Sequence, residues 1–322
     1  MRITLLAALT LVLPLLLGFV LVDRLGRWAG CGDISGRYAN SPRVSLNGSS
    51  ALSVHPPPAD RLPPTLRFVV APVVSPKSSL KLYKLLSSYL AQQLGTRVEL
   101  MPHDSYAGVN ALLRHNKCDF AFVCTFPFVE GERDYGLRAI AIPQIGGKHV
   151  YYSYIIVRKG VAAKSLLDLR NRRFASADVL SNTGWVYPRY WLEQRSVKVK
   201  TFFSSHVLAG SHDRAVQAVT SGEADAAAVD SIVYDQLART DPAVKKRTRI
   251  IQISPPFGMP PIVASPGLDP AMLKRIRNVL LQAHRTPGGR EALQRLGFDR
   301  FVAYRPELYD SVRAMSRHLG SK

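Results

Sequence analysis

The fold is decided first by residues 66–95, which read LRFVVAPVVSPKSSLKLYKLLSSYLAQQLG. The opening LRFVVAPV is a short apolar run rich in β-branched residues, typical of a buried strand. Apolar residues then recur near helical spacing at Leu80, Tyr83, Leu86, Leu90 and Leu94. Gly95 follows them as a residue that commonly ends a helix. The stretch therefore predicts a strand, a polar turn and a helix, in that order.

The same order repeats downstream. Strands are expected at residues 97–102, 119–124 and 137–145, with helices at 105–116 and, more briefly, Pro127–Glu132 between them. A long strand at 149–159 follows, and the alternation restarts with strands at 173–178, 199–204 and 225–230. Such alternation indicates a parallel sheet that helices cover on both faces. A strand at 249–254 precedes helices near Pro270–His284, Gly288–Leu296 and Pro306–His318.

Two α/β units of this size predict two lobes. The C-terminal helices have no sheet of their own, so we expect them to pack on the first lobe. This assigns residues 65–151 plus 254–322 to lobe 1 and residues 152–253 to lobe 2. The chain would cross between the lobes near Tyr152–Arg158 and again near Arg249–Pro256. Because ligands bind beyond the carboxyl ends of strands in open α/β sheets, a cleft between the lobes is the expected site.

The N-terminus indicates export. Residues 4–22 form an apolar run without a charged residue, preceded by Arg2 and interrupted by Pro14. A run of this length is compatible with a signal peptide or with a retained membrane anchor, so residues 1–31 are assigned to either role. Residues 32–64 contain HPPPADRLPP and show no apolar period, which predicts a linker. The folded body is therefore expected in the periplasm or elsewhere outside the cytoplasm.

The chain of 322 residues is strongly basic, with a formal net charge of +20 and a pI near 10.2. Nucleic acid, an anionic membrane and a small anion are the partners that such a charge suggests, beside a merely solvated basic surface. Zinc-finger spacing, RNA-binding aromatic signatures and a long basic arm are missing from the sequence, so no nucleic-acid partner is expected. No metal site, cofactor or common catalytic motif is expected either, which makes an enzyme a remote alternative.

Cys118 and Cys124 bracket the strand DFAFV. Six residues of strand span about 20 Å, whereas a disulfide needs Cα atoms within about 7 Å. We therefore expect both thiols to be unpaired, most simply as buried side chains.

The turn SNTG, residues 181–184, lies between a predicted strand and an aromatic helix. One interpretation is an ordinary helix cap, for which these residue types are common. The other is an oxyanion site, because the first N–H groups of a helix have no intrahelical partner and the side chains of Ser181, Asn182 and Thr183 add donors. Gly184 would let an anion approach the backbone. The turn alone leaves both open.

Four runs together resemble the phosphate/phosphite/phosphonate-binding family of periplasmic substrate-binding proteins. They are YAGVNALLRHNKCDFAFV, GKHVYYSYIIVRK, ADVLSNTGWVYP and GSHDRAVQAVTSGEADAAAV, within residues 66–265. The resemblance implies a type II periplasmic-binding fold: two α/β lobes joined by two crossover strands, with a cleft that closes on an oxyanion. It also implies delivery to a membrane permease with an ATPase or, in some relatives, signalling to a membrane sensor kinase.

The resemblance places the ligand at Ser181, Asn182, Thr183 and Gly184, with His212, Tyr151 and Tyr106 nearby. Asp213 would cap its helix or orient His212, since a carboxylate repels an anion. At the ends of two other predicted strands, Ser78, Thr125 and Cys124 are further candidates to contact the ligand.

The match departs from the family where relatives hold an ammonium group with acidic residues. Ile232 stands at the position of a glutamate in those relatives, and the aspartate expected near Pro260 is absent. A desolvated ammonium would lack a counter-charge there, so we expect phosphate, phosphite or an alkylphosphonate. The alternative function is a sensory protein that signals to a histidine kinase. Cys124 also leaves open an arsenite-like ligand, because a thiolate is a good soft ligand.

Overall fold

The structure, a computed structural model, describes residues 65–320. The predicted export segment or anchor and the predicted linker, residues 1–31 and 32–64, lie outside the described residues. Within residues 65–320, no helix is long and apolar enough to cross a bilayer.

The first sheet has the strand order β13-β4-β12-β3-β1-β2. Its strands are β1 (Leu66–Val70), β2 (Val98–Pro102), β3 (Phe120–Phe122), β4 (Arg138–Gln144), β12 (Ile262–Ala264) and β13 (Arg300–Val302). β1 runs parallel to β2 and β3, whereas β12 is antiparallel to both β3 and β4. The expectation of a parallel sheet is therefore wrong in part, because β12 enters from the opposite direction after the chain returns from the second sheet.

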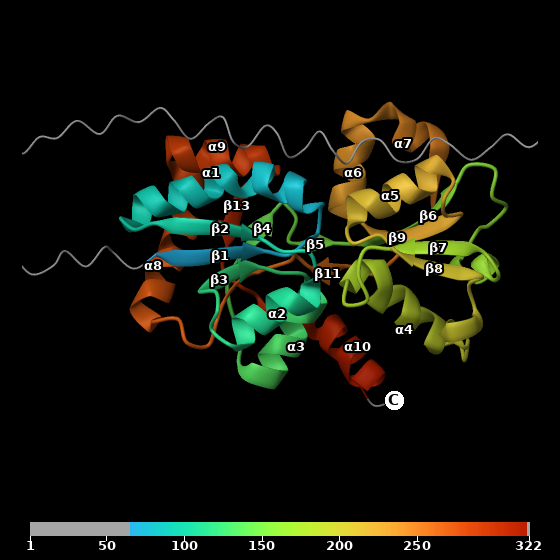
Figure 1. Ribbon diagram of the computed structural model, residues 1–322, viewed down its shortest axis with the longest axis horizontal. Coiled ribbons are helices and arrows are strands. Elements are labelled where there is room, and N and C mark those ends of the chain that lie inside the picture. The colour runs from blue at the N-terminus through green and yellow to red at the C-terminus, as the bar shows by residue number, and fades with distance from the viewer. Residues whose placement is uncertain (1–64, 321–322) are drawn as a thin grey trace, which may run out of the picture. The chain divides into compact units, whose positions relative to one another are not determined.

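Helices cover both faces of the first sheet (Figure 1). One core forms around α1 (Pro76–Leu94), α8 (Pro270–Gln282) and α9 (Pro287–Leu296). The other forms around α2 (Tyr106–Arg114), α3 (Thr125–Tyr135) and α10 (Asp310–Gly320). A short 3-10 turn at Ala283–Arg285 joins α8 to α9, and another at Pro306–Tyr309 leads into α10. The C-terminal helices thus pack on the first sheet, and α10 also contacts the helix Tyr187–Glu193 of the second lobe.

The second sheet has the order β10-β6-β9-β7-β8. Its strands are β6 (Ser153–Arg158), β7 (Arg173–Ser176), β8 (Ser205–Leu208), β9 (Ala226–Asp230) and β10 (Thr248–Ile253). On one face lie α5 (His212–Ser221), α6 (Ser231–Thr240) and α7 (Pro242–Arg247), and on the other α4 (Tyr187–Glu193) (Figure 1). β7 is parallel to β8 and β9, while β6 is antiparallel to β9 and β10.

Two chain segments cross between the sheets. They meet as β5 (Val150–Tyr151) and β11 (Phe257–Gly258), which pair antiparallel. The predicted long strand at 149–159 is thus two strands, interrupted at Tyr152. We call the first sheet with its helices lobe 1 and the second with its helices lobe 2. Two α/β lobes linked by two crossing strands are the arrangement expected of a type II periplasmic-binding fold.

One predicted strand of lobe 2 is wrong. Residues 199–204 were expected to be a strand but contain a 3-10 turn at Val199–Thr201, and the strand β8 begins only after them. A further 3-10 turn of this lobe lies at Leu166–Leu169. Phe202 is fully buried and Phe203 stacks on Phe174 at a centroid distance of 4.2 Å. Phe202 is thus buried and Phe203 half-buried without β pairing, so their apolar character misled the strand assignment.

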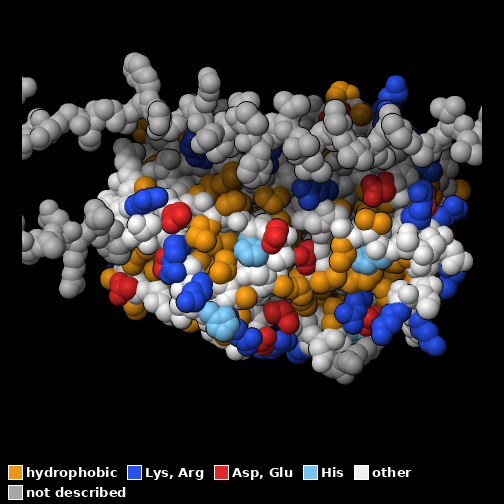
Figure 2. All heavy atoms as spheres, viewed as in Figure 1, with side chains coloured by type: hydrophobic (Ala, Val, Ile, Leu, Met, Phe, Trp, Pro, Cys, Tyr) orange, Lys and Arg blue, Asp and Glu red, His pale blue; other side chains and the backbone are white. Residues whose placement is uncertain are grey.

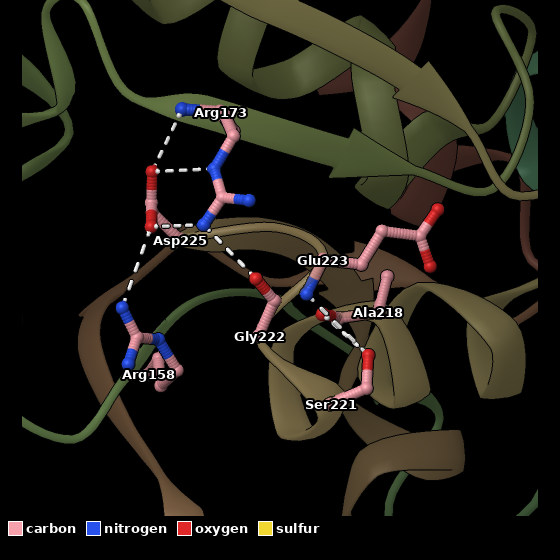
Figure 3. A network of polar contacts seen from close by, with 7 residues as sticks. All are labelled: Arg158, Arg173, Ala218, Ser221, Gly222, Glu223 and Asp225. Atoms are coloured by element: carbon pink, nitrogen blue, oxygen red, sulfur yellow. Dashed lines mark hydrogen bonds and ion pairs between the residues drawn. The ribbon is translucent and has the colours of Figure 1, made fainter. Parts of the chain in front are cut away.

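A carboxylate joins three strand ends of lobe 2 (Figure 3). Asp225 accepts hydrogen bonds from Arg173 Nε at 3.2 Å and Nη2 at 2.9 Å, and Arg158 Nη2 lies 3.7 Å away. Arg173 also donates to the Gly222 carbonyl at the end of α5. The Arg173 hydrogen bond holds the pKa of Asp225 below its usual value. On the face of the molecule that Figure 2 shows, Lys and Arg side chains lie interspersed with Asp and Glu, so the basic charge on that face is not gathered in one patch.

Candidate functional site

The SNTG turn begins with a helix cap. The Ser181 hydroxyl accepts from the Gly184 N–H at 3.0 Å. A π-helical turn at Asn182–Val186 follows and leads into α4. Within it, the N–H groups of Trp185 and Val186 both donate to the Ser181 carbonyl. The cap interpretation is therefore correct for Ser181.

His212 lies next to this turn and is held as a neutral donor. Its Nδ1 accepts from the Asp230 N–H at 3.1 Å, which places the ring hydrogen on Nε2. Nε2 lies 3.1 Å from the Ser181 hydroxyl oxygen. Burial lowers the pKa of His212 to about 3, against a smaller opposing effect of Asp213. The imidazole is thus uncharged at neutral pH and offers one N–H.

Ser181 can still donate a hydrogen bond. Its oxygen accepts from Gly184 and from His212, so its own hydrogen is not used in either bond. A Cβ on Gly184 would lie 2.9 Å from the Ser181 Oγ and 3.2 Å from His212 Cε1. Glycine is therefore required for these two side chains to approach, a reason that differs from the one inferred from sequence.

Three buried polar atoms around the turn have no hydrogen-bonding partner among the described residues. They are the Tyr106 hydroxyl, Asn182 Oδ1 and the Thr183 hydroxyl, in side chains at most 1% exposed. Buried polar atoms of a folded protein are normally paired, so these atoms mark a place where a polar group fits. Tyr106 belongs to lobe 1, whereas Asn182 and Thr183 belong to lobe 2. Burial raises the pKa of Tyr106, which remains a neutral donor.

We call Ser181, Thr183, His212, Tyr106 and the Asn182 amide the oxyanion corner. It contains three hydroxyl groups and one imidazole N–H, and none of its members is a Lys or Arg. Asn182 Nδ2 donates to the Tyr151 hydroxyl at 3.2 Å, leaving Oδ1 toward the corner. Rotating the amide by 180° would present its NH2 group instead.

Tyr151 and Thr125 lie behind the corner. The Tyr151 hydroxyl donates to Thr125 Oγ1 at 3.0 Å, and the Thr125 hydroxyl donates to the Gly258 carbonyl at 3.0 Å. Both hydroxyl hydrogens are therefore engaged within the protein. Tyr151 and Thr125 orient Asn182 and hold the crossing strands, so in this arrangement they are not free to donate to a ligand.

The two described cysteines are free and buried, as expected. Cys124 Sγ lies 4.0 Å from the Tyr151 hydroxyl. Burial raises the pKa of Cys124 to about 11 and that of Cys118 to about 12. Both are therefore thiols rather than thiolates at neutral pH, and only Cys124 borders the corner.

This protonation state leads to a prediction for arsenite. We expect arsenite to leave the melting temperature of the wild-type protein and of Cys124→Ser equally unchanged, because soft ligands bind the thiolate form. Thermal unfolding with and without arsenite measures this. A stabilisation present in the wild type and lost in Cys124→Ser would contradict the prediction and identify Cys124 as a ligand.

Asp213 contacts the opposite lobe. Its Oδ1 accepts from the Ser75 N–H at 3.0 Å and from the Ser211 hydroxyl at 2.5 Å. It makes no hydrogen bond to His212, so the expected orienting role is replaced by a link between lobes. Asp178 makes a second link, because its Oδ2 accepts from the Tyr106 N–H at 3.2 Å. The backbone N–H of His212 adds a third link, because it donates to the Val73 carbonyl at 3.0 Å.

Ser78 lies apart from the corner. Its hydroxyl oxygen accepts from the Ser75 hydroxyl at 3.0 Å. With Lys81 and Arg295 it lines a separate surface cavity of about 300 Å³. None of the hydrogen bonds of Ser78 connects it to the oxyanion corner.

Sequence reasoning missed two acidic residues. Asp230 is 2% exposed, caps α6 and donates its N–H to His212. Asp178 bonds across the lobes. An Asp immediately before a predicted helix is a cap signal that would have drawn attention to Asp230, but no sequence signal connects Asp178 to Tyr106.

Within residues 65–320, no group of three or more His, Cys, Asp or Glu residues is arranged to hold a metal ion.

Comparison with known proteins gives a family match over residues 68–309, to the family described as "ABC transporter, phosphonate, periplasmic substrate-binding protein". The phosphonates-binding periplasmic protein of Escherichia coli (strain K12) is 27% identical over 219 residues, covering 66% of this chain and 64% of that protein. The probable ABC transporter phosphite binding protein of Prochlorococcus marinus (strain MIT 9301) is 23% identical, covering 85% of this chain and 96% of that protein.

A solved structure from Prochlorococcus marinus, in complex with methylphosphonate, has a TM-score of 0.72 and 22% identity to this chain. The similarity covers 80% of this chain and 99% of that one. The likeness confirms the type II periplasmic-binding fold expected from the sequence.

Proposed function

The chain belongs to the family of periplasmic substrate-binding proteins of phosphonate ABC transporters, and on that premise we propose that its oxyanion corner binds a small phosphorus oxyanion. The ligand would be phosphate, phosphite or an alkylphosphonate, delivered outside the cytoplasm to a membrane permease with its ATPase. The relatives are transporter components rather than enzymes or sensors, so the sensory alternative gains no support.

One observation carries this proposal. The hydroxyls of Tyr106 and Thr183, from opposite lobes, are both buried without a partner among the described residues. Closing two lobes over such groups costs free energy unless a ligand accepts their hydrogen bonds. Ser181 provides a third hydroxyl, which matches the three oxygens of a phosphonate group. A ligand of this kind would therefore bridge the lobes and favour their closed arrangement.

The relatives support the ligand class. Their descriptions name phosphonates, phosphite and, in the solved complex, methylphosphonate as ligands of those proteins. A thermal-shift panel of phosphate, phosphite, methylphosphonate and sulfate on the full-length protein tests the class. A ligand at about 100 times its Kd should stabilise the protein by about 2.7 kcal/mol. Stabilisation by sulfate alone, or by none of the four, would contradict the proposal.

Thr183→Val separates a ligand donor from a structural cap. We expect it to weaken oxyanion binding by about 1–3 kcal/mol, because a ligand oxygen loses its donor. The free protein should become no less stable, since the hydroxyl that is removed is buried without a partner. Calorimetric titration and urea unfolding measure the two effects.

Two further variants serve as controls for Thr183→Val. Ser181→Ala should weaken binding and also destabilise the protein by about 1 kcal/mol, because it removes a cap. Thr201→Val, at an exposed position of lobe 2, should leave affinity unchanged. Wild-type affinity in Thr183→Val would show that this hydroxyl does not contact the ligand.

A further inference from the structure

The helices that cover one face of the first sheet carry an unbalanced charge. α1, together with α8, α9 and the 3-10 turn between them, contains nine Lys and Arg residues and one acidic residue, Glu291. All nine basic side chains are exposed. Because α1 packs against both α8 and α9 around one core, these side chains belong to one side of lobe 1. We call α1, α8, α9 and their basic side chains the basic layer.

The helices on the other side of this sheet are balanced in charge (Figure 1). α2, α3 and α10 contain four Lys or Arg residues and four acidic residues. All four acidic residues are ion-paired, two with Arg133 and two with Arg313. In the basic layer, by contrast, none of the nine basic side chains makes an ion pair with a described residue. The excess positive charge of lobe 1 is therefore concentrated on one side.

The lysines of α1 are placed at a cost to their own helix. Lys77 lies in the first turn, which has no acidic residue, and a helix N-terminus disfavours a positive charge. Lys77 and Lys81 are four residues apart, so their charges repel each other. Leu80 and Leu85 lie beside them and are 42% and 37% exposed. With Lys84 these residues form one exposed stripe of basic and apolar side chains, which suggests a partner outside the protein.

We propose that the basic layer docks on an anionic phospholipid membrane. A small anion would need charges gathered at one cavity, whereas only Lys81 and Arg295 of the nine line the cavity of about 300 Å³ beside Ser78. Charges spread over three helices match an extended anionic surface instead. A membrane interface also accepts the two exposed leucines, while long basic side chains keep their charged ends at the headgroups.

The location of the protein agrees with this partner. The chain belongs to a periplasmic family, so it lies beside a membrane rather than beside nucleic acid. Each Lys or Arg close to an anionic bilayer strengthens binding by a factor of about five. Docking through the basic layer would hold the protein at the surface in which the proposed permease lies. No member of the oxyanion corner belongs to the basic layer, so docking and oxyanion binding use separate residues.

Lysine footprinting of the full-length protein tests the proposal. Vesicles of phosphatidylcholine alone are compared with vesicles that also contain phosphatidylglycerol, and mass spectrometry gives the acetylation rate of each lysine. We expect Lys77, Lys81 and Lys84 to react at least about fivefold more slowly on the anionic vesicles. This protection should disappear in about 1 M NaCl, where the Debye length is only about 3 Å. The comparison holds whether or not residues 1–31 attach the chain to the bilayer.

Three other lysines are internal controls for the footprint. Lys117, Lys198 and Lys200 are exposed and lie outside the basic layer. They should react at the same rate on both kinds of vesicle. Slower reaction of all six lysines alike would show non-specific adsorption and would contradict docking through the basic layer.

A triple variant, Arg285→Gln with Arg290→Gln and Arg295→Gln, removes three charges and keeps the lysines of α1 as probes. We expect its affinity for the anionic vesicles to fall by about 100-fold, so that the protection of α1 is lost. Thermal unfolding checks that the variant folds, and exposed side chains without ion pairs should be replaceable without loss of stability.

The matched control combines Arg114→Gln, Arg172→Gln and Arg195→Gln. It changes the net charge by the same amount at exposed positions outside the basic layer, so the protection of α1 should remain. Equal reaction rates on both kinds of vesicle in the wild type, or protection that survives in the Arg285, Arg290 and Arg295 variant, would overturn the proposal. Protection that needs native membranes with their proteins, and is not seen on pure phospholipid, would assign the basic layer to an acidic protein and overturn it as well.

Discussion

Asp230→Asn is expected to stabilise the ligand-free protein at about pH 8 by up to about 4 kcal/mol, and to lose this advantage at about pH 4. Burial raises the pKa of the folded carboxyl from 3.8 to about 7, and each pKa unit corresponds to about 1.36 kcal/mol. Between pH 3.8 and about pH 7, the Asp230 carboxyl holds a proton in the folded state and has released it in the unfolded state. The wild type therefore gains stability from this group as the pH falls from about 7 toward 4, and bears the full cost of the buried charge above 7.

Urea unfolding of both proteins at several pH values measures this difference. His212 and His206, whose pKa values burial lowers to about 3 and about 4, act in the opposite direction. Each resists protonation when folded, so stability falls below about pH 6.5 in both proteins. Their contribution cancels in the comparison. A stability difference that stays constant from about pH 5 to about pH 8 would show that Asp230 is not ionised at a cost in the folded protein.

Local patterns predicted the elements of the fold better than their pairing. The helix in residues 66–95 and the strand of residues 225–230 were both found where apolar spacing placed them. The antiparallel β12 was not foreseen, because strand direction depends on where the chain returns from the other lobe. The short β13 was missed because its three residues carry little periodic signal. Residues 199–204 were misread because buried aromatic residues occur in turns as well as strands.

The site shows the same division between local and long-range information. The sequence brought attention to Ser181, Thr183 and His212, and the structure brings them together because each lies just after a strand of the same sheet. The partners of their side chains were not predictable. Nothing near Tyr106 in the sequence indicates that Asp178, 72 residues away, accepts its N–H. Thr125 and Tyr151 were expected at the ligand, yet their hydroxyls pair with one another.

Asp178 and Asp213 are the residues outside the oxyanion corner whose joint removal should weaken ligand binding most. Both are carboxylates of lobe 2 that accept a backbone N–H at the start of a lobe 1 helix. Asp213 accepts the N–H of Ser75, just before α1, and Asp178 accepts the N–H of Tyr106, at the start of α2. Neither helix has an acidic residue in its own first turn. Because helix N-termini carry positive partial charge, the opposite lobe supplies the negative group only when the lobes are closed.

We expect Asp178→Ala and Asp213→Ala each to weaken oxyanion binding about tenfold, and the double variant about 100-fold, as the closed form loses hydrogen bonds to charged groups. The loss should lie mainly in faster ligand dissociation, because closure follows the encounter. Stopped-flow kinetics and small-angle scattering of the ligand-bound protein measure the dissociation rate and the closure. The Asn variants retain an acceptor oxygen, so they should lose less affinity than the Ala variants.

Asp241→Ala is the matched control, since it removes a carboxylate cap within lobe 2 that makes no bond to lobe 1. It should lower stability and leave affinity unchanged, because it acts equally on the open and closed arrangements. If the double variant loses stability to the same extent and yet binds the oxyanion with wild-type affinity, the two carboxylates serve only as local caps. The closed arrangement would then depend on the ligand and on the other contacts between the lobes, such as those of α10 with α4 and the bond from the backbone N–H of His212 to the Val73 carbonyl.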